Sequence, residues 1–273
     1  MTLPSSGQIS LNQIHIEAGG SSGSQAAMND SDIRDMIGKG STSQNSFSEY
    51  YGVSAAAPSG TYKGRTITTG NGFPSGYVTL SSGSKLVVVT CQLAGPNNTY
   101  VSLGGTNMTL AAKMEGAASG GVWPGGVTSA IYYLVTSASG STYITGNGGS
   151  GRSVTHTWEI TGYNSSSPAS TAAVQNTNPN SYSKVIGLTT QFNGITIGSG
   201  ISEDTVPANQ GGISVSNSDS LIQIDLESAT NHYTWRDEGT GSGTTNYTVT
   251  HNGTGSGYNN TSTIFQLTAA HWK

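Results

Sequence analysis

The chain has 273 residues, of which only 9% are charged, and its formal net charge is −4 at neutral pH. Ordinary soluble domains have about 25% charged residues, so the surface is expected to consist mainly of neutral hydroxyl and amide groups. The 10 basic residues are scattered singly along the chain. This scatter argues against a nucleic acid partner, because phosphate backbones attract clusters of Lys and Arg.

No stretch approaches the roughly 18 consecutive apolar residues of a membrane-spanning helix, and the N-terminus lacks the basic and apolar regions of a signal peptide. We therefore expect synthesis in a cytoplasm and no membrane insertion. Cys91 is the single cysteine, which excludes a disulfide within the chain. The apolar run Lys85–Leu93 around it favours a buried side chain.

The first 52 residues contain three short segments in which a polar cap precedes a brief apolar stretch and a glycine. These segments are Ser10–Gly19, Asp30–Gly38 and Ser46–Gly52. Ser10 with Gln13, and Ser46 with Glu49, match the capping box, and the glycine permits a left-handed helix end. Each segment is therefore predicted to be a helix of one or two turns.

Helices of this length are marginal in water, because nucleation costs more than so few hydrogen bonds return. Since only polar and glycine-rich connectors join them, we expect them to dock onto another chain, so that residues 1–52 form an attachment segment. The side chains expected to make this contact are Ile9, Leu11, Ile14, Ile16, Ile33, Met36, Ile37, Phe47, Tyr50 and Tyr51.

Residues 53–60 contain small residues and a proline without periodicity, which predicts a linker. Beyond it, strand-like runs alternate with clusters of Gly, Asn and Ser. The clearest is Ser153–Tyr163, whose alternation predicts one face in the core and one in water. Lys85–Leu93 is apolar on both faces and is predicted to be a central strand.

More than ten such runs follow one another, and no convincing long helix occurs after residue 53. This pattern argues against alternating strands and helices in a parallel sheet. The sequence therefore predicts an all-β domain over residues 61–273, in which antiparallel sheets pack face to face as one two-layer sandwich.

Five segments from about Ser81 onward carry a resemblance: Leu86–Thr90, Val101–Leu110, Ile131–Leu134, Ile160–Tyr163 and Thr263–Ala270. With them the chain resembles the jelly-roll β-sandwich domains of phage structural proteins and secreted bacterial surface proteins. Separately, Leu3–Leu11 and Phe47–Gly52 resemble the leader of tail-associated and other virion structural proteins of tailed phages.

The resemblance implies a non-enzymatic virion protein, assembled in the host cytoplasm, that forms a fibre-like part of the tail, baseplate or neck. It also implies attachment to other virion proteins through residues 1–52 and a homo-oligomer, with a trimer as the leading state. The jelly roll is then displayed toward the host surface. A capsid decoration or cement protein is the alternative within this class.

Paired acids provide the alternative from a different class, a surface-polysaccharide hydrolase. They are Glu203 with Asp204, Asp237 with Glu238, and the group Asp219, Asp225 and Glu227. Hydrolysis needs two carboxyls about 5 to 10 Å apart, whereas adjacent strand residues point to opposite faces. We interpret these acids as solvated loop residues and expect no catalytic residue.

The five histidines show none of the close spacings that are typical of metal ligands. Asp30, Asp32 and Asp35 lack the later ligands of a calcium loop. We therefore expect neither a metal nor a cofactor.

Aromatic residues between neutral loops suggest contact with a host surface glycan, because rings combined with hydroxyl and amide groups suit sugars. Loops at the ends of a sandwich carry most binding functions. The predicted glycan contacts are Trp123, Trp235 and Tyr258. A purely carbohydrate-binding module remains a third class of function.

Overall fold

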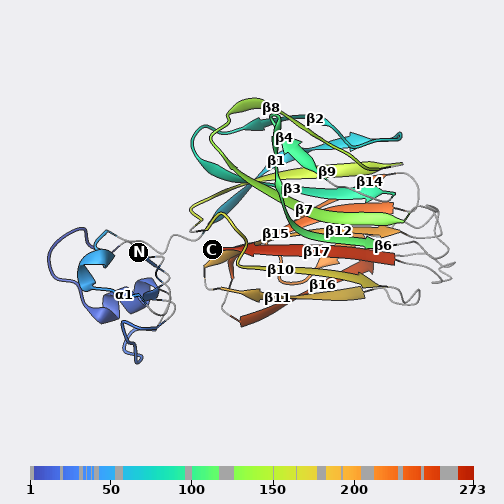
Figure 1. Ribbon diagram of the computed structural model, residues 1–273. Helices are drawn as coiled ribbons and strands as arrows, with labels where there is room; N and C mark the ends of the chain where they lie inside the picture. Colours follow the sequence, from blue (N-terminus) through green and yellow to red (C-terminus); the bar gives the residue numbers. More distant parts are fainter. Residues whose placement is uncertain are drawn as a thin grey trace. The chain divides into compact units, whose positions relative to one another are not determined.

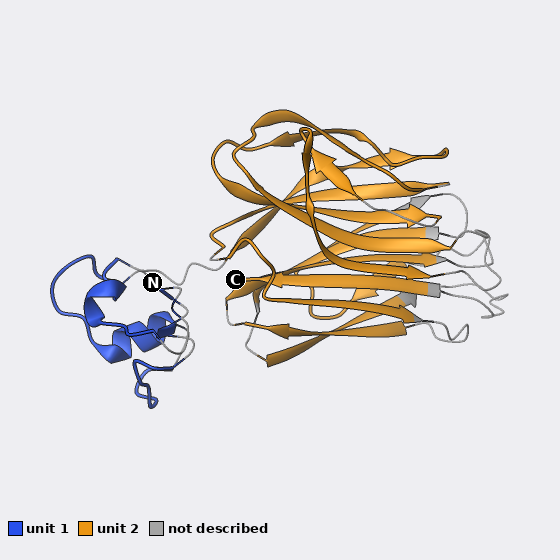
Figure 2. Cartoon of the chain, in the orientation of Figure 1, with its two compact units in different colours: residues 1–57 blue, residues 58–273 orange. Residues whose placement is uncertain are grey.

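The computed structural model describes residues 3–18, 21–30, 33–34, 36–37, 39, 43–52, 58–95, 100–116, 126–149, 151–163, 165–176, 183–191, 193–203, 212–226, 230–240, 243–252 and 264–273. The chain forms two compact units, which Figure 2 shows in different colours. The N-terminal unit is Met1–Ala57 and the body is Pro58–Lys273. Each unit has buried hydrophobic residues of its own.

Two helices of the N-terminal unit are α1 (Leu11–Glu17) and the 3₁₀ helix η1 (Phe47–Tyr50). At α1 the N–H of Ser10 donates to Gln13 Oε1 at 2.8 Å, and the N–H of Gln13 donates to Ser10 Oγ at 3.2 Å. At η1 the N–H of Ser46 donates to Glu49 Oε2 at 2.7 Å. The predicted side-chain caps are therefore present at both helix starts.

The short segments of the N-terminal unit pack against one another. Its buried hydrophobic residues are Leu3, Ile14, Ala18, Ile33 and Tyr50. Asn45 Nδ2 donates to the Tyr50 hydroxyl at 2.9 Å and so fixes η1 to the preceding loop. The expectation that these helices need another chain in order to become ordered is wrong, because the unit supplies the packing that short helices require.

The body begins with β1 at Ser59, inside the predicted linker, and its strands form two successive sets. The first set is β1 (Ser59–Thr68), β2 (Gly76–Leu80), β3 (Lys85–Ala94), β4 (Val101–Leu103), β5 (Thr106–Asn107), β6 (Thr109–Gly116), β7 (Val127–Thr136), β8 (Gly140–Gly146) and β9 (Ser153–Thr161). The second set is β10 (Ser170–Asn176), β11 (Ser183–Thr190), β12 (Gly194–Glu203), β13 (Gly212–Val215), β14 (Ser220–Leu226), β15 (Thr230–Thr240), β16 (Gly243–Asn252) and β17 (Ile264–Trp272).

Each set forms two sheets, whose paired strands are all antiparallel. In the first sandwich, inner sheet 1 has the order β1-β9-β3-β7-β6 and outer sheet 1 the order β2-β8-β4-β5. In the second sandwich, inner sheet 2 has the order β10-β17-β12-β15-β14 and outer sheet 2 the order β11-β16-β13. Apart from β5, the two sandwiches repeat one strand order.

The sheets lie as four layers: outer sheet 1, inner sheet 1, inner sheet 2 and outer sheet 2 (Figure 1). One hydrophobic cluster fills each of the three spaces between neighbouring layers. The all-β antiparallel fold is confirmed, whereas the expectation of a single two-layer sandwich is wrong. The more specific jelly-roll assignment stays a prediction.

Inner sheet 1 is covered on both of its faces, which explains two outcomes. All ten residues of β3 are buried, as predicted for a central strand. In β9, residues from Ser153 to Ile160 are also buried, so the prediction of a wet face is wrong. The outer sheet covers one side of this strand and the second sandwich covers the other.

A polar seam lies between the two inner sheets. Its buried side chains are Thr90, Gln92, Ser129, His156, Ser199, His232, Thr234 and Thr268. Gln92 Nε2 donates to Ser199 Oγ at 2.6 Å, and the hydroxyls of Ser129 and Thr268 lie 2.9 Å apart. These bonds join the two sandwiches through side chains.

The first strand is also fastened to the second sandwich. Arg236 Nη1 of β15 donates to the carbonyl oxygen of Gly60, and the N–H of Gly60 donates to Glu238 Oε1 at 2.5 Å. A Cβ added at Gly60 would lie 2.7 Å from Ile195 Cδ1, so this close contact requires glycine.

Candidate functional site

The described acids of β15 and the loop before β14 are engaged in local contacts. Asp237 Oδ2 accepts a hydrogen bond from the Tyr247 hydroxyl at 2.8 Å, and burial raises the pKa of this carboxyl. Asp219 Oδ2 accepts the N–H of Glu238 at 2.6 Å, while the Glu238 carboxylate pairs with Arg236 at 3.4 Å. These carboxyls have structural contacts that account for them. Asp204, Glu227 and the side chains of Glu203 and Asp225 lie outside the described residues.

The described histidines of the body are structural in their surroundings. His156 Nδ1 lies 3.0 Å from the Tyr62 hydroxyl, and His271 Nε2 accepts the N–H of Gln191 at 2.9 Å. Burial lowers the pKa of His156 and of His232 to about 3. Across the part of the chain that the structure describes, no three His, Cys, Asp or Glu side chains lie together as a metal site would require.

The predicted glycan contacts have different outcomes. Trp235 is fully buried in the cluster between inner sheet 2 and outer sheet 2, so its predicted contact with a glycan is wrong. The tryptophan ring lies over Gly198 of the neighbouring strand β12, where a Cβ would come within 1.9 Å of Trp235 Cε2. The ring fills space that the glycine leaves. Trp123 and Tyr258 lie outside the described residues.

The ten predicted attachment residues divide into three groups. Those buried inside the N-terminal unit are Ile14, Ile33 and Tyr50. Those partly buried against the same core are Ile9, Leu11, Met36 and Ile37. Those exposed are Ile16, Phe47 and Tyr51. Only the third group is placed to contact another molecule, since the first two stabilise the unit itself.

An exposed pair of tyrosines lies on the outward face of outer sheet 1. Tyr77 of β2 is 69% exposed and Tyr143 of β8 is 42% exposed. They are direct partners across the antiparallel pair, with ring centroids 4.8 Å apart and ring planes at 56°. The pair places two rings side by side at the solvent surface.

The inward neighbours of these tyrosines explain their direction. Val78, Leu80 and Ile144 belong to the hydrophobic cluster beneath outer sheet 1. Because side chains alternate along a strand, Tyr77 and Tyr143 must point outward. The alternation could have identified both tyrosines from the sequence, since each directly precedes a residue of the apolar face.

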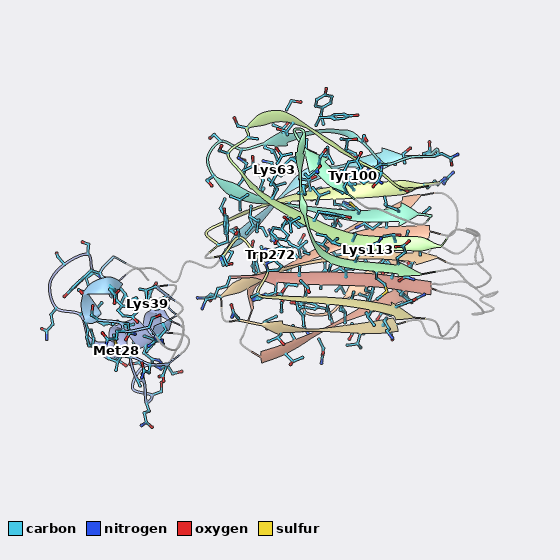
Figure 3. The ribbon with its side chains drawn as sticks, in the orientation of Figure 1. Met28, Lys39, Lys63, Tyr100, Lys113 and Trp272 are labelled. Atoms are coloured by element: carbon cyan, nitrogen blue, oxygen red, sulfur yellow. The ribbon has the colours of Figure 1, made fainter. Side chains whose placement is uncertain are left out.

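A third tyrosine, Tyr100, continues this face beside the start of β4 (Figure 3). It is 43% exposed, and its N–H donates to Asn147 Oδ1 at 3.1 Å. Asn147 lies four residues beyond Tyr143, which corresponds to about 13 Å along an extended strand. Between them, the hydroxyl of Thr145 accepts a hydrogen bond from Ser75 Oγ at 3.1 Å.

The surface formed by Tyr77, Tyr143 and Tyr100, here called the tyrosine face, is electrically neutral. The strands β2, β4, β5 and β8 contain no Asp, Glu, Lys or Arg. Exposed hydroxyls of Thr79 and Ser141 border the tyrosine pair. Tyrosine combines an apolar ring with a polar tip, so this surface offers both stacking and hydrogen bonding to a neutral ligand.

Comparisons with family models, with curated proteins and with solved structures find no match for this chain. Within the residues that are described, no helix has both the length and the apolar character needed to cross a membrane.

Proposed function

We propose that this chain is a non-enzymatic structural protein of a virion, which its N-terminal unit attaches to the particle while its β-sandwich body faces outward. The observation that carries this proposal is the division into a small unit and a large neutral body. The resemblance of Leu3–Leu11 and Phe47–Gly52 to phage virion leaders supports the location in a particle. A fibre-like part of the tail, baseplate or neck is the preferred position.

The N-terminal unit suits attachment because it is small and carries exposed apolar side chains. Phe47 is 41% exposed, Ile16 37% and Tyr51 36%. A unit of this size obtains only a few kcal/mol from its core, so binding to a neighbour adds to its stability by mass action. In this proposal the virion partner buries these three side chains.

The body suits display because its described carboxyls have structural contacts and its outer surface is neutral. Three hydrophobic clusters support the four sheets, so the body does not depend on the N-terminal unit for its core. We propose a homo-oligomer in the particle, with a trimer as the leading state. Light scattering of the purified full chain measures this state directly.

The test compares incorporation into particles. Particles assembled with the full chain are purified and probed for it, alongside particles assembled with residues 58–273 alone. We expect the full chain to sediment with the particles and the shortened chain to stay in the soluble fraction with its strand content intact by circular dichroism. If the full chain is absent from particles, the proposal is wrong.

A second comparison locates the contact. Replacing Ile16 and Phe47 by Ser removes two exposed apolar side chains of the N-terminal unit, and we expect incorporation to fall. Val185→Ser is the matched control, because Val185 is an exposed apolar residue of the body at 47% exposure. Equal incorporation of all variants would contradict attachment through the N-terminal unit.

A further inference from the structure

The tyrosine face is the largest exposed aromatic feature of the described body that its packing does not require. A cross-strand aromatic pair stabilises a sheet by itself, but such stabilisation does not need a ring that is 69% exposed, as Tyr77 is. Exposed aromatic rings on a soluble domain commonly mark an interaction surface. The face therefore has a role in binding to weigh against a role in folding.

We propose that the tyrosine face binds a neutral polysaccharide, with the rings of Tyr77 and Tyr143 stacked against sugar residues. The proposal rests on the proposed function, because it names the class of host-surface ligand that the displayed body contacts. The predicted glycan contacts at Trp123, Trp235 and Tyr258 are not part of this surface.

Charge selects the class of ligand. None of the strands of outer sheet 1 carries a charged side chain, so an anionic or cationic polymer finds no opposite charge on these strands. Transferring a charge to a surface without a partner is unfavourable. A neutral sugar, in contrast, presents apolar C–H faces to the rings and hydroxyl groups to Thr79 and Ser141.

The extent of the face indicates a chain of sugars. Tyr100 lies beside Asn147, about 13 Å along the strand direction from Tyr143. A ligand that contacts both ends must extend over several sugar units along β8. Gly104, whose N–H donates to the carbonyl oxygen of Tyr143 at 2.8 Å, brings no side chain to the space beside the tyrosine.

The second sandwich provides an internal control. Outer sheet 2 repeats the strand order of outer sheet 1, with β11 in the place of β2 and β16 in the place of β8. The exposed apolar residue of β11 is Val185, which pairs with Thr248 of β16. An equivalent substitution there changes an exposed strand residue without touching the tyrosine face.

The experiment is affinity electrophoresis of the full chain in native gels that contain dextran, mannan, galactomannan or xyloglucan, with anionic alginate as a comparison. We expect retardation by at least one neutral polymer. Tyr77→Thr and Tyr143→Thr are each expected to weaken that binding about tenfold, as truncation of a central aromatic contact does. Val185→Thr is expected to bind as the unmodified chain does.

Two further readouts separate binding from folding. Tyr77→Phe retains the ring and is expected to retain binding, and thermal unfolding is expected to shift by only a few degrees in every variant. Retardation by none of the neutral polymers, preferential retardation by alginate, or equal binding of the Thr variants would overturn the proposal. A chain that enters particles but binds no polymer leaves the proposed function standing and rejects this inference alone.

Discussion

The two sandwiches have one strand order but distribute side-chain volume differently. The central strand of inner sheet 1, β3, is rich in Leu and Val, whereas the corresponding strand of inner sheet 2, β12, contains three glycines. Both strands have neighbours on each side and both line a hydrophobic cluster. The second sandwich must therefore obtain its volume elsewhere.

Cross-strand pairs show where that volume comes from. In the first sandwich Val89 of β3 lies opposite Tyr132 of β7. In the second, Gly198 of β12 lies opposite Trp235 of β15, and a Cβ at Gly198 would reach the tryptophan ring. An aromatic side chain that covers a strand glycine compensates for the missing side chain. The two halves teach that the volume of a pair is retained while its division between partners changes.

The largest expected effect tests this exchange of volume. Gly198→Val inserts atoms where Trp235 lies, and we expect a loss of about 3 kcal/mol or more in the free energy of unfolding. Adding Trp235→Tyr recreates the Val–Tyr pair of the first sandwich and should recover part of the loss. Urea unfolding monitored by circular dichroism measures both changes.

Gly70→Ala is the control for the glycine substitution, because a Cβ at Gly70 meets no atom within 4 Å. We expect this variant to be close to neutral. A double variant no more stable than Gly198→Val alone would show that the two pairs are not interchangeable.

The next effect concerns the seam that joins the two sandwiches. Burial holds the pKa of His156 and of His232 at about 3, below the value of about 6.5 for an unfolded chain. The unfolded state binds these protons first, so stability is full above about pH 6.5 and falls as the pH drops toward 3. His232→Leu should reduce the loss between pH 7 and pH 5 by about 2 kcal/mol.

Thr90→Val changes the same seam without removing a titratable group. It is expected to shift the curve of unfolding free energy against pH while leaving its slope unchanged. If His232→Leu gives a curve parallel to that of the unmodified chain, His232 is not the source of the acid sensitivity.

A smaller effect measures how firmly the seam couples the sandwiches. Trp158 Nε1 of inner sheet 1 donates to Thr234 Oγ1 of inner sheet 2 at 3.1 Å. A double-mutant cycle of Trp158→Phe and Thr234→Val is expected to give a coupling free energy of about 1 kcal/mol. Additive effects would mean that this hydrogen bond contributes nothing to the joint.

The smallest effects are expected on the two outer sheets. Tyr77→Thr and Val185→Thr both replace exposed strand residues with a residue that favours strands. We expect each to change the free energy of unfolding by less than about 1 kcal/mol. A much larger loss for Tyr77→Thr in thermal unfolding would assign the tyrosine pair a structural role.

The sequence predicts local features of this chain well. The capping boxes at Ser10 and Ser46 and the buried strand around Cys91 follow from residue types a few positions apart. The number of sandwiches could not be predicted, because alternation reports the two faces of one strand and not what covers them. Thr155 and Thr157 read as solvent-facing, yet outer sheet 1 buries them.

The candidate site shows the same division. Trp235 reads as a loop aromatic because its partner, Gly198, is distant in the sequence and is placed opposite it only by strand pairing. Tyr77 and Tyr143 lie in predicted strands, but their pairing depends on the register of β2 with β8. The outward direction of each ring is local information, whereas their proximity is not.

The attachment of Gly60 to Arg236 and Glu238 has a mechanical consequence. Traction on the N-terminus enters the body through β1, which is bonded along β9 and is also held by β15 of the other half. The load is therefore shared by both halves from the first residues of the body, and peeling away the leading strand requires breaking contacts in both at once.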